Sequence, residues 1–462
     1  MKRSAIITAI AAAASLTGTA PASAAAAPGG LEYVKTEQLS PRLQEITFHA
    51  PALAGDTGVR VLLPTGYETG KRRYPVLYLL NGALDDQRSW TDKGAAEQIT
   101  APYPVIVVMP SGGSYGNYVD WYNGGAGGPP MWETYHIRQL LPWIDSHFRT
   151  KGGRGGRAIA GLSMGGGGTM HYAARHPELF AAAASFSGAV DTNYAPAQPL
   201  TETSGSGDGV PPGSVFGHRQ TDEIRWRGHN PWDLAENVKG LHLELMTGNG
   251  SPGGPGGDSG DPVESGVHAE SVSFHDRLGA LGFPHVWNDY GAGGHAWFYW
   301  QRDLTQFLPR LMDVYARPPK PPVPFDYRSI DTSYDVYGWN VQVDRPAVEF
   351  SRLGAASRSG FELSGSGAAT VRTAGYYRPR RRYVVATRDG AGTKRATRRA
   401  DGHGRLRIPV GLGPGNPYQE YSPQGNAWVA QNGSTSGSGP LAGEQSGWPV
   451  HTTTVSIKRA HG

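Results

Sequence analysis

A serine in the middle of the chain stands between an apolar run and a helix-like run. Ser163 is the centre of the G-x-S-x-G segment 161–165, which follows the strand-like run 158–160 and precedes apolar residues at three- and four-residue spacing. Glycines two positions before and after the serine allow a strand and a helix to approach closely around a sharp turn. Such a turn exposes the serine Oγ, and the backbone N–H of Met164 would face negative charge that develops on a substrate oxygen. The segment therefore predicts a nucleophilic serine.

The G-x-S-x-G pattern alone is weakly specific in this chain. With 66 glycines in 462 residues, about 0.5 copies are expected by chance. A second copy does occur at 112–116, with Ser114 at its centre. It follows an apolar run at 105–108 but leads into no helical pattern, so we interpret it as a loop. The sequence context, rather than the pattern, selects Ser163.

A serine nucleophile needs a base and an acid, and in α/β-hydrolases the chain order is serine, acid, histidine. His295 lies in a glycine-rich segment after the last predicted strand, and we expect it to take the hydroxyl proton and return it to the leaving group. The acid should follow the strand predicted at 241–247. Asp258, Asp261 and Glu264 all lie there, and the pattern does not choose among them. We interpret Asp289 as a surface or hydrogen-bonding carboxylate.

A second oxyanion donor is expected from the loop after an early strand. Residues 77–80 are apolar and are followed by Asn81, Gly82 and Ala83. We therefore expect the Ala83 N–H to act beside the Met164 N–H.

The elements that must position these residues alternate between strands and helices from about residue 32 to residue 317. This alternation predicts an α/β fold with a mostly parallel sheet covered by helices. The predicted strands are 44–49, 58–63, 75–80, 105–109, 157–160, 182–187, 241–247 and 285–289. The predicted helices are 95–100, 133–148, 169–176, 264–281 and 296–315. Glycine- and proline-rich segments at 124–130, 204–214 and 250–261 either border the active site or are surface loops.

The composition changes after a proline-rich linker at 317–324. Short alternating runs follow, at 339–343, 383–387, 405–408 and 453–457, with no helical pattern. They predict a C-terminal all-β, sandwich-like module at 325–462, after a catalytic domain at 28–316.

The C-terminal part is basic. Residues 317–462 carry 20 Lys and Arg against 10 Asp and Glu, whereas the whole chain has a net charge of +4. Two interpretations stay open: attraction to an anionic cell wall or polymer surface, or a solvated basic face. We expect no nucleic-acid partner.

The N-terminus predicts export. A charged start, an apolar run from Ala5 to Ala14 and the small-residue site 22–24 form a signal peptide over residues 1–24. We expect a secreted, extracellular protein, in which cell-wall association is one option, without a transmembrane segment in the mature chain. The absence of cysteine excludes disulfides and thiolate chemistry, and we expect neither a cofactor nor a metal.

Several motifs in the same order resemble the secreted mycolyltransferase group of the esterase D-like α/β-hydrolases, over about residues 79–300. These motifs are LLNG at 79–82, VVMP at 107–110, DWY at 120–122, WET at 132–134, GLSM at 161–164, NP at 230–231, GNG at 248–250 and GHAWFYW at 294–300. The resemblance implies a nine-stranded, mostly parallel sheet. It selects Glu264 as the acid, which gives a Ser163–Glu264–His295 triad with Ala83 and Met164 as oxyanion donors.

The chain departs from the trehalose-acylating members of that group at the oxyanion loop. Those members carry an Asp-Gly pair and then an arginine, whereas this chain has Asn81-Gly82 and lacks the arginine before Asp85. The departure weakens the case for trehalose as acceptor. Asn81 and Trp297 are the candidate substrate contacts.

These observations predict a secreted serine esterase that acts on lipid or sugar acyl esters through an acyl-serine intermediate. The alternative is an acyltransferase of the mycolyltransferase or diacylglycerol acyltransferase type, which passes the acyl group to a sugar or glycerol hydroxyl. A further alternative is a non-catalytic cell-surface binding protein that keeps the hydrolase fold as a scaffold. A third enzymatic hypothesis is a depolymerase of a polysaccharide or polyester, with the β module as its substrate anchor.

Overall fold

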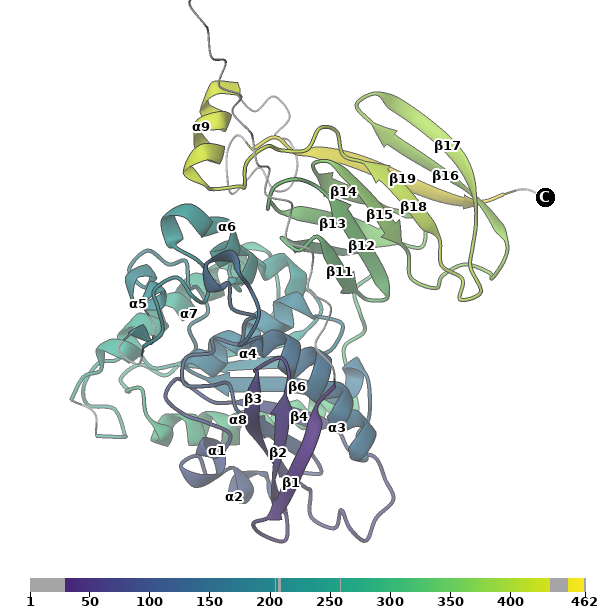
Figure 1. Cartoon of the computed structure of the whole chain (residues 1–462). Helices are drawn as coiled ribbons and strands as arrows, with labels where there is room; N and C mark the ends of the chain where they lie inside the picture. Colours follow the sequence, from purple (N-terminus) through teal and green to yellow (C-terminus); the bar gives the residue numbers. More distant parts are fainter. Residues whose placement is uncertain (1–29, 204, 207–208, 258, 433–447, 461–462) are drawn as a thin grey trace, which may run out of the picture.

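The computed structural model describes residues 30–203, 205–206, 209–257, 259–432 and 448–460; the predicted signal peptide lies outside them. Within these residues, nine strands form one mixed sheet in the order β1-β2-β3-β5-β4-β6-β7-β8-β9 (Figure 1). The strands from β5 to β9 across the sheet are parallel, whereas β1, β2 and β3 are antiparallel to their neighbours. Their bounds are β1 (Glu32–Gln38), β2 (Leu43–Ala50), β3 (Gly55–Leu62), β4 (Val76–Leu80), β5 (Ile106–Pro110), β6 (Arg157–Leu162), β7 (Ala182–Phe186), β8 (His242–Thr247) and β9 (Val286–Asp289).

Helices cover both faces of this sheet. One buried cluster joins the sheet to the π-helical turn η2 and to α3, α4 and α7, and a second joins its other face to α1, α2 and α8. Helices α5 and α6 belong to the segment between β7 and β8. The bounds are α1 (Ser89–Asp92), α2 (Ala96–Thr100), η2 (Thr134–Leu140), α3 (Leu141–His147), α4 (Met164–Arg175), α5 (Gln198–Glu202), α6 (Arg219–His229), α7 (Pro262–Ala280) and α8 (Trp297–Ala316). None of the helices in the described ranges is long and apolar enough to cross a bilayer.

Strand β6 is apolar along most of its length because both of its faces are covered. Ile159 packs in the cluster that contains Met170 of α4, whereas Ala160 packs in the cluster that contains Phe307 of α8. Successive strand side chains point to opposite faces, and here both faces are covered. A central parallel strand therefore needs apolar residues at every position.

The sequence-based prediction is correct for most of this part. All eight predicted strands form, each within three residues of the predicted bounds, and the five predicted helical regions are helical. The edge strand β1 and the helices α1, α5 and α6 were not predicted. The sheet is mixed, so the expected mostly parallel order describes only the strands from β5 to β9.

The C-terminal part builds two antiparallel sheets around a core of its own. Within the described residues one sheet has six strands, β10-β13-β14-β19-β16-β17, and the other has four, β11-β12-β15-β18. Trp339, Leu353, Phe361 and Val371 lie in the shared buried cluster. The strand bounds are β10 (Phe325–Ser329), β11 (Ser333–Val336), β12 (Trp339–Asp344), β13 (Ser351–Ser357), β14 (Gly360–Gly365), β15 (Ala368–Arg372), β16 (Arg382–Asp389), β17 (Gly392–Arg399), β18 (Arg407–Gly411) and β19 (His451–Arg459).

The expectation that this module lacks helices is wrong. Helix α9 (Pro423–Asn432) follows β18 and lies beside the sandwich (Figure 1). Its glycine, glutamine and asparagine residues give no apolar stripe at helical spacing, so periodicity could not reveal it. Trp448, beyond the helix, stacks edge-to-face on Trp428, with ring centroids 6.0 Å apart.

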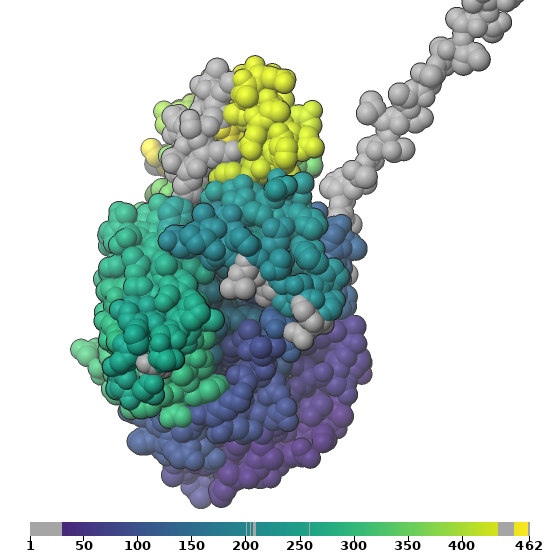
Figure 2. Space-filling model, turned by 90° about the vertical axis from the view of Figure 1, so that its left-hand side faces the viewer, coloured from purple at the N-terminus to yellow at the C-terminus, as the bar shows by residue number. Residues whose placement is uncertain are grey.

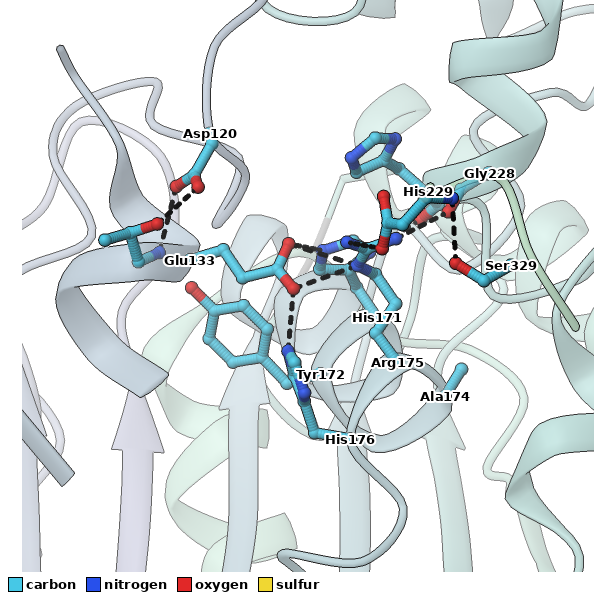
Figure 3. A network of polar contacts seen from close by, with 12 residues as sticks. Asp120, Glu133, His171, Tyr172, Ala174, Arg175, His176, Gly228, His229 and Ser329 are labelled. Carbon is cyan, nitrogen blue, oxygen red and sulfur yellow. Dashed lines mark hydrogen bonds and ion pairs between the residues drawn. The ribbon is translucent and has the colours of Figure 1, made fainter. Parts of the chain in front are cut away.

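The two parts share a polar interface at the end of α4 (Figure 3). Glu133 accepts hydrogen bonds from Arg175 Nε at 2.9 Å and contacts His176 Nε2 at 2.7 Å. Arg175 also donates to Asp331 of the module at 2.9 Å. In addition, Ile330, Phe350 and Val450 of the module lie in the same buried cluster as residues of α4. The module is therefore packed against the helix that begins after Ser163.

Candidate active site

Ser163 occupies a strained turn between β6 and α4. Its φ of 52° and ψ of −123° lie outside the regions that non-glycine residues favour. A Cβ on Gly161 would collide with the carbonyl of Gly165, and a Cβ on Gly165 would collide with the carbonyl of Asn81. Both flanking glycines are therefore needed for the close approach that the sequence pattern predicts. The Ser163 residue remains partly exposed.

Glu264 and His295 meet at the same edge of the sheet. His295 Nδ1 lies 2.8 Å from Glu264 Oε2, and the Glu264 side chain is fully buried. Glu264 Oε1 accepts from Ser187 Oγ at 2.8 Å, from the Gly248 N–H at 2.7 Å and from Thr247 Oγ1 at 3.1 Å. These bonds offset the cost of burying the carboxylate. With Nδ1 engaged, Nε2 is the His295 nitrogen left for proton transfer.

The topology explains this convergence. Ser163, Ser187 and Thr247 lie at the carboxyl ends of the adjacent parallel strands β6, β7 and β8, and the loop of His295 follows β9. In open α/β sheets this edge is where ligands bind.

Asp261 anchors the loop that carries His295. Its Oδ1 accepts the N–H groups of Val263 at 2.9 Å and of Glu264 at 3.1 Å, which caps α7, and its Oδ2 accepts the His295 N–H at 2.7 Å. Burial would raise the pKa of Asp261, but these three backbone hydrogen bonds outweigh it and hold the pKa below its ordinary value.

The structure distinguishes between two of the three carboxylates that the sequence offered as the catalytic acid. Glu264 contacts the imidazole, whereas Asp261 holds backbone N–H groups; Asp258 lies outside the described residues. Asp289 accepts from His268 at 2.9 Å and from the Gly291 N–H at 3.0 Å, which confirms its interpretation as a hydrogen-bonding carboxylate. The role of Asp261 was readable from the D-P-V-E segment 261–264, because an Asx residue, a proline and a glutamate in this order mark a helix start.

The loop after β4 lies directly against Ser163. A Cβ built on Gly82 would be 3.3 Å from the Ser163 Cβ. Within the described part of the chain, no acceptor takes the N–H of Ala83 or of Met164. Leu84 donates to the carbonyl of Ser114 at 2.9 Å. The second G-x-S-x-G segment is thus a loop, as interpreted, and it supports the loop of Ala83.

Asn81 is corrected from a substrate contact to a positioning residue. It is 1% exposed, and its Nδ2 donates to the carbonyls of Gly82 at 2.8 Å and Asp85 at 3.0 Å. Its Oδ1 accepts the Gly112 N–H at 2.9 Å. A carboxamide engaged at both ends shapes the loop, and its burial keeps it away from substrate.

Trp297 begins α8 two residues after His295. Its ring packs edge-to-face on Trp90, with centroids 5.2 Å apart, and on Trp300 at the same distance. The residue is partly buried. Trp300 in turn packs edge-to-face on the His295 imidazole at 4.9 Å.

A small cavity lies beside the candidate oxyanion donor Met164. A cavity of about 30 Å³ is lined by Met164, Gly168, His171 and Ala189, among other residues. A volume of this size holds a few water molecules at most. On the surface, blue, teal and green segments of the chain surround a hollow, shown in Figure 2. Among the described residues, no group of three or more His, Asp or Glu side chains is arranged to hold a metal ion.

Comparison with known sequences places the chain in a family. The sequence profile of the Esterase family matches residues 50–311. The chain belongs to the esterase family. Esterase Rv1288 of Mycobacterium tuberculosis (strain ATCC 25618 / H37Rv) is 36% identical over 291 residues, which are 61% of this chain and 62% of that protein. The chain thus spans about three fifths of the length of that relative.

Other relatives carry transferase names. The diacylglycerol acyltransferase/mycolyltransferase Ag85B of Mycobacterium leprae (strain TN) is 29% identical over 271 residues, 55% of this chain and 80% of that protein. Among solved structures, Mycobacterium tuberculosis MPT51 (FbpC1) aligns with a TM-score of 0.49 and 23% identity, over 61% of this chain and 98% of that one.

Proposed function

We propose that this member of the esterase family is a secreted serine esterase that cleaves acyl esters through an acyl-Ser163 intermediate. The observation that carries the proposal is the 2.8 Å contact between His295 Nδ1 and the buried Glu264, at the same sheet edge as the strained Ser163. This combination orients an imidazole for proton transfer and exposes a hydroxyl for attack.

The reaction runs in two halves. His295 Nε2 takes the Ser163 hydroxyl proton as Oγ attacks the ester carbonyl, and the N–H groups of Ala83 and Met164 stabilise the oxyanion. The alcohol leaves with that proton, and the acyl group stays on Ser163. Water then attacks the acyl-enzyme, His295 accepts its proton and returns it to Ser163 Oγ, and a free acid is released. Glu264 stabilises the imidazolium that forms in each half.

Water is the acceptor that the site favours. Ser163 and His295 are partly exposed, which supports access of water to the acyl group. We expect water to reach the acyl-enzyme through the exposed side of these two residues. Trp297 is the proposed aromatic contact for the substrate.

Acyl transfer to a sugar or glycerol hydroxyl is the second candidate. The relatives named diacylglycerol acyltransferase/mycolyltransferase favour it, because the match covers 80% of Ag85B from Mycobacterium leprae. Against it stands the loop of Asn81, which lacks the Asp-Gly pair and the arginine expected of trehalose-acylating proteins.

The proposal includes the domain division and the location. Residues 1–24 would direct export and be removed, residues 28–316 would form the catalytic domain, and the linker 317–324 would lead to the module at 325–462. The charged and apolar segments of the first 24 residues support export.

Product analysis tests the acceptor. One short and one long acyl ester are incubated with the enzyme, with and without trehalose or glycerol, and Ser163→Ala serves as the blank. We expect free acid alone in both conditions, abolished in the variant. An acylated sugar or glycerol that depends on Ser163 would show a transferase instead. Absence of any Ser163-dependent product would support the non-catalytic binding protein.

A further inference from the structure

Two buried polar atoms behind the proposed acid have no hydrogen-bond partner. Within the described residues, neither the hydroxyl oxygen of Tyr290 nor Oδ2 of Asp303 has one. Other buried side-chain atoms share this lack. Burial raises the pKa of Tyr290 and of Asp303, and these are the two members of the group to which the Glu264 carboxylate adds a further rise. Because buried polar groups are usually satisfied, two such groups beside one acid need an explanation.

The Tyr290 ring is held in place at the start of the loop that carries the proposed base. It stacks on Tyr299, which follows the loop, with ring centroids 5.4 Å apart and planes inclined by 8°. The guanidinium carbon of Arg302 lies 3.8 Å from the centroid of the Tyr290 ring. A Cβ on Gly248 would lie 2.8 Å from Cε2 of this ring, and the Gly248 N–H donates to Glu264 Oε1. The ring therefore packs against the turn that supports the acid.

The groups that face the Tyr290 hydroxyl come from three elements. Burial raises the pKa of this hydroxyl, and the carboxylates of Asp303 on α8 and Glu264 on α7 raise it further. Ser187, which follows β7, and Arg302 on α8 oppose the rise. The hydroxyl therefore stays protonated at neutral pH and is a hydrogen-bond donor beside two carboxyl groups.

Ser187 offers an acceptor for this donor. Its hydroxyl proton is donated to Glu264 Oε1 at 2.8 Å, and a hydroxyl oxygen that donates its proton can still accept a hydrogen bond. A donation from Tyr290 to Ser187 would satisfy the tyrosine. It would also strengthen the bond from Ser187 to Glu264, because hydrogen bonds in a chain polarise one another.

Asp303 offers a donor to the oxygen of Tyr290. Its Oδ1 accepts from Arg302 Nη2 at 3.2 Å, whereas Oδ2 is the atom without a partner. Burial raises the pKa of Asp303 to about 7, with Arg302 opposing the rise and Glu264 adding to it. Below pH 7 the carboxyl is therefore mostly protonated, and a protonated carboxyl has one O–H to donate.

We propose that Asp303 and Tyr290 are positioning residues for the acid: the Asp303 carboxyl donates to the Tyr290 hydroxyl, which donates to the serine behind Glu264. This hydrogen-bonded chain holds Glu264 and, through it, the imidazole of His295. Each proton stays on its own oxygen, so no bond of the chain is made or broken in the reaction. The inference rests on the proposed function, because it concerns the orientation of the proposed base.

The test removes one link of the chain at a time. Tyr290→Phe keeps the stacked ring and removes the hydroxyl. The matched control is Tyr299→Phe, because the Tyr299 hydroxyl accepts the Gly256 N–H at 3.1 Å and lies outside the proposed chain. Asp303→Leu removes the second donor, whereas Asp303→Asn keeps an N–H donor at nearly the same place.

Two readouts are measured: steady-state kinetics on a soluble ester, and the pKa of His295 by NMR of labelled histidine, with His295→Ala to assign the resonance. We expect Tyr290→Phe to lower kcat by about threefold to tenfold, the effect of one hydrogen bond, with KM within about twofold of the parent value. The pKa of His295 should rise by on the order of 0.5, because a less stabilised carboxylate favours the imidazolium more strongly.

The variants of Asp303 test the order of the chain. Asp303→Leu should reproduce the effects of Tyr290→Phe, and Asp303→Asn should recover most of the activity that Asp303→Leu loses. Combining Asp303→Leu with Tyr290→Phe should add little further loss, because both changes break the same chain. Unchanged unfolding midpoints show that a variant is folded, and Tyr290→Phe decides the test if Asp303→Leu is not.

The proposal would be overturned by a Tyr290→Phe enzyme with the parent kcat and the parent pKa of His295. Equal losses in Tyr299→Phe, or additive losses in the double variant, would also overturn it. A parent protein without Ser163-dependent activity would refute the proposed function instead. In that case, a pKa of His295 that still rises in Tyr290→Phe would support the hydrogen-bonded chain, since the NMR measurement needs no turnover.

Discussion

At the scale of single residues, the site depends on groups that hold other groups in place. Glu264 contacts the imidazole, but Ser187, Thr247 and Gly248 hold Glu264. Patterns in the sequence locate the candidate serine and histidine because each stands in a glycine-rich turn after a strand. The choice of Glu264 came from family resemblance. The supporting hydroxyls could not be predicted, because their roles follow from strand order rather than from local sequence.

Two substitutions of Asp261 distinguish its role in capping α7 from its role in positioning His295. Asp261→Ala removes the acceptors for Val263, Glu264 and His295. We expect a loss of about 1 kcal/mol in stability and a fall in kcat on the order of tenfold or more as the His295 loop shifts. Asp261→Asn keeps one acceptor for the cap. It should retain stability while kcat stays low and KM changes little.

Kinetics and chemical denaturation of both variants check this prediction, with Asp289→Asn as the matched control. Asp289 lies in the same loop region but bonds to His268 and Gly291, so kcat should not change. An Asp261→Asn enzyme with the parent kcat would refute the positioning role.

At the scale of elements, the strands and helices that were predicted correctly are those with extensively buried apolar side chains. The strands with both faces covered read as apolar runs and were found. Strand β1 was missed because all seven of its residues are exposed and it pairs only with β2 at the sheet edge. Helix α6 was missed because it is dominated by polar and charged side chains, and only Ile224 and Trp226 supply large buried apolar groups. Tertiary contacts, rather than local pattern, stabilise these elements.

Helix α7 carries a buried carboxyl group, Glu270, whose protonation should make the stability of the protein depend on pH. Glu270 is 4% exposed, and burial raises its pKa to about 8, although the Asp191 N–H that it accepts opposes the shift. Because the folded-state pKa lies above the ordinary value of 4.5, the folded state binds more protons than the unfolded state between these pH values. Stability contributed by the neutral form is therefore complete below pH 4.5 and is lost as pH rises towards 8.

Glu270→Gln should remove this loss, because the amide stays neutral and still accepts a hydrogen bond. We expect the variant to gain thermal stability relative to the parent protein as pH rises from 5 to 9, by on the order of several kcal/mol at most. Melting curves across this range provide the measurement, with the exposed Glu32→Gln as the control. A constant difference between variant and parent at all pH values would contradict the assignment.

At the scale of the whole molecule, the C-terminal module is part of the same packed structure as the catalytic sheet. Ile330, Phe350, Tyr421, Trp448 and Val450 of the module share a buried cluster with the sheet and α4. Deleting the module would expose these apolar side chains, so a truncated chain should lose stability and solubility. The sequence predicted two structural parts, but their interface depends on residues that are far apart in the chain.

Arg175 tests how strongly the two parts are joined. Burial would raise the pKa of Glu133, but Arg175, His171 and His176 outweigh it and hold the pKa well below its ordinary value. Arg175→Met leaves this carboxylate with only the two histidines and removes the partner of Asp331. Because breaking a buried pair leaves an uncompensated charge, we expect a loss of about 3–5 kcal/mol in unfolding free energy.

Denaturant titration checks this value against Arg372→Met. Arg372 lies 3.9 Å from Asp335 in a pair whose side chains are 45% and 53% exposed, and its loss should cost about 1 kcal/mol or less. Equal effects of the two substitutions would mean that the interface network contributes no more than a surface pair.

The most direct test of the central claim is covalent labelling with a fluorophosphonate followed by peptide mass spectrometry. The proposal predicts one adduct, on Ser163, that disappears in Ser163→Ala, forms much more slowly in His295→Ala and is unchanged in Ser114→Ala, the serine of the second G-x-S-x-G segment. An unlabelled folded protein, or an adduct on any other residue, would contradict an acyl-serine mechanism at Ser163.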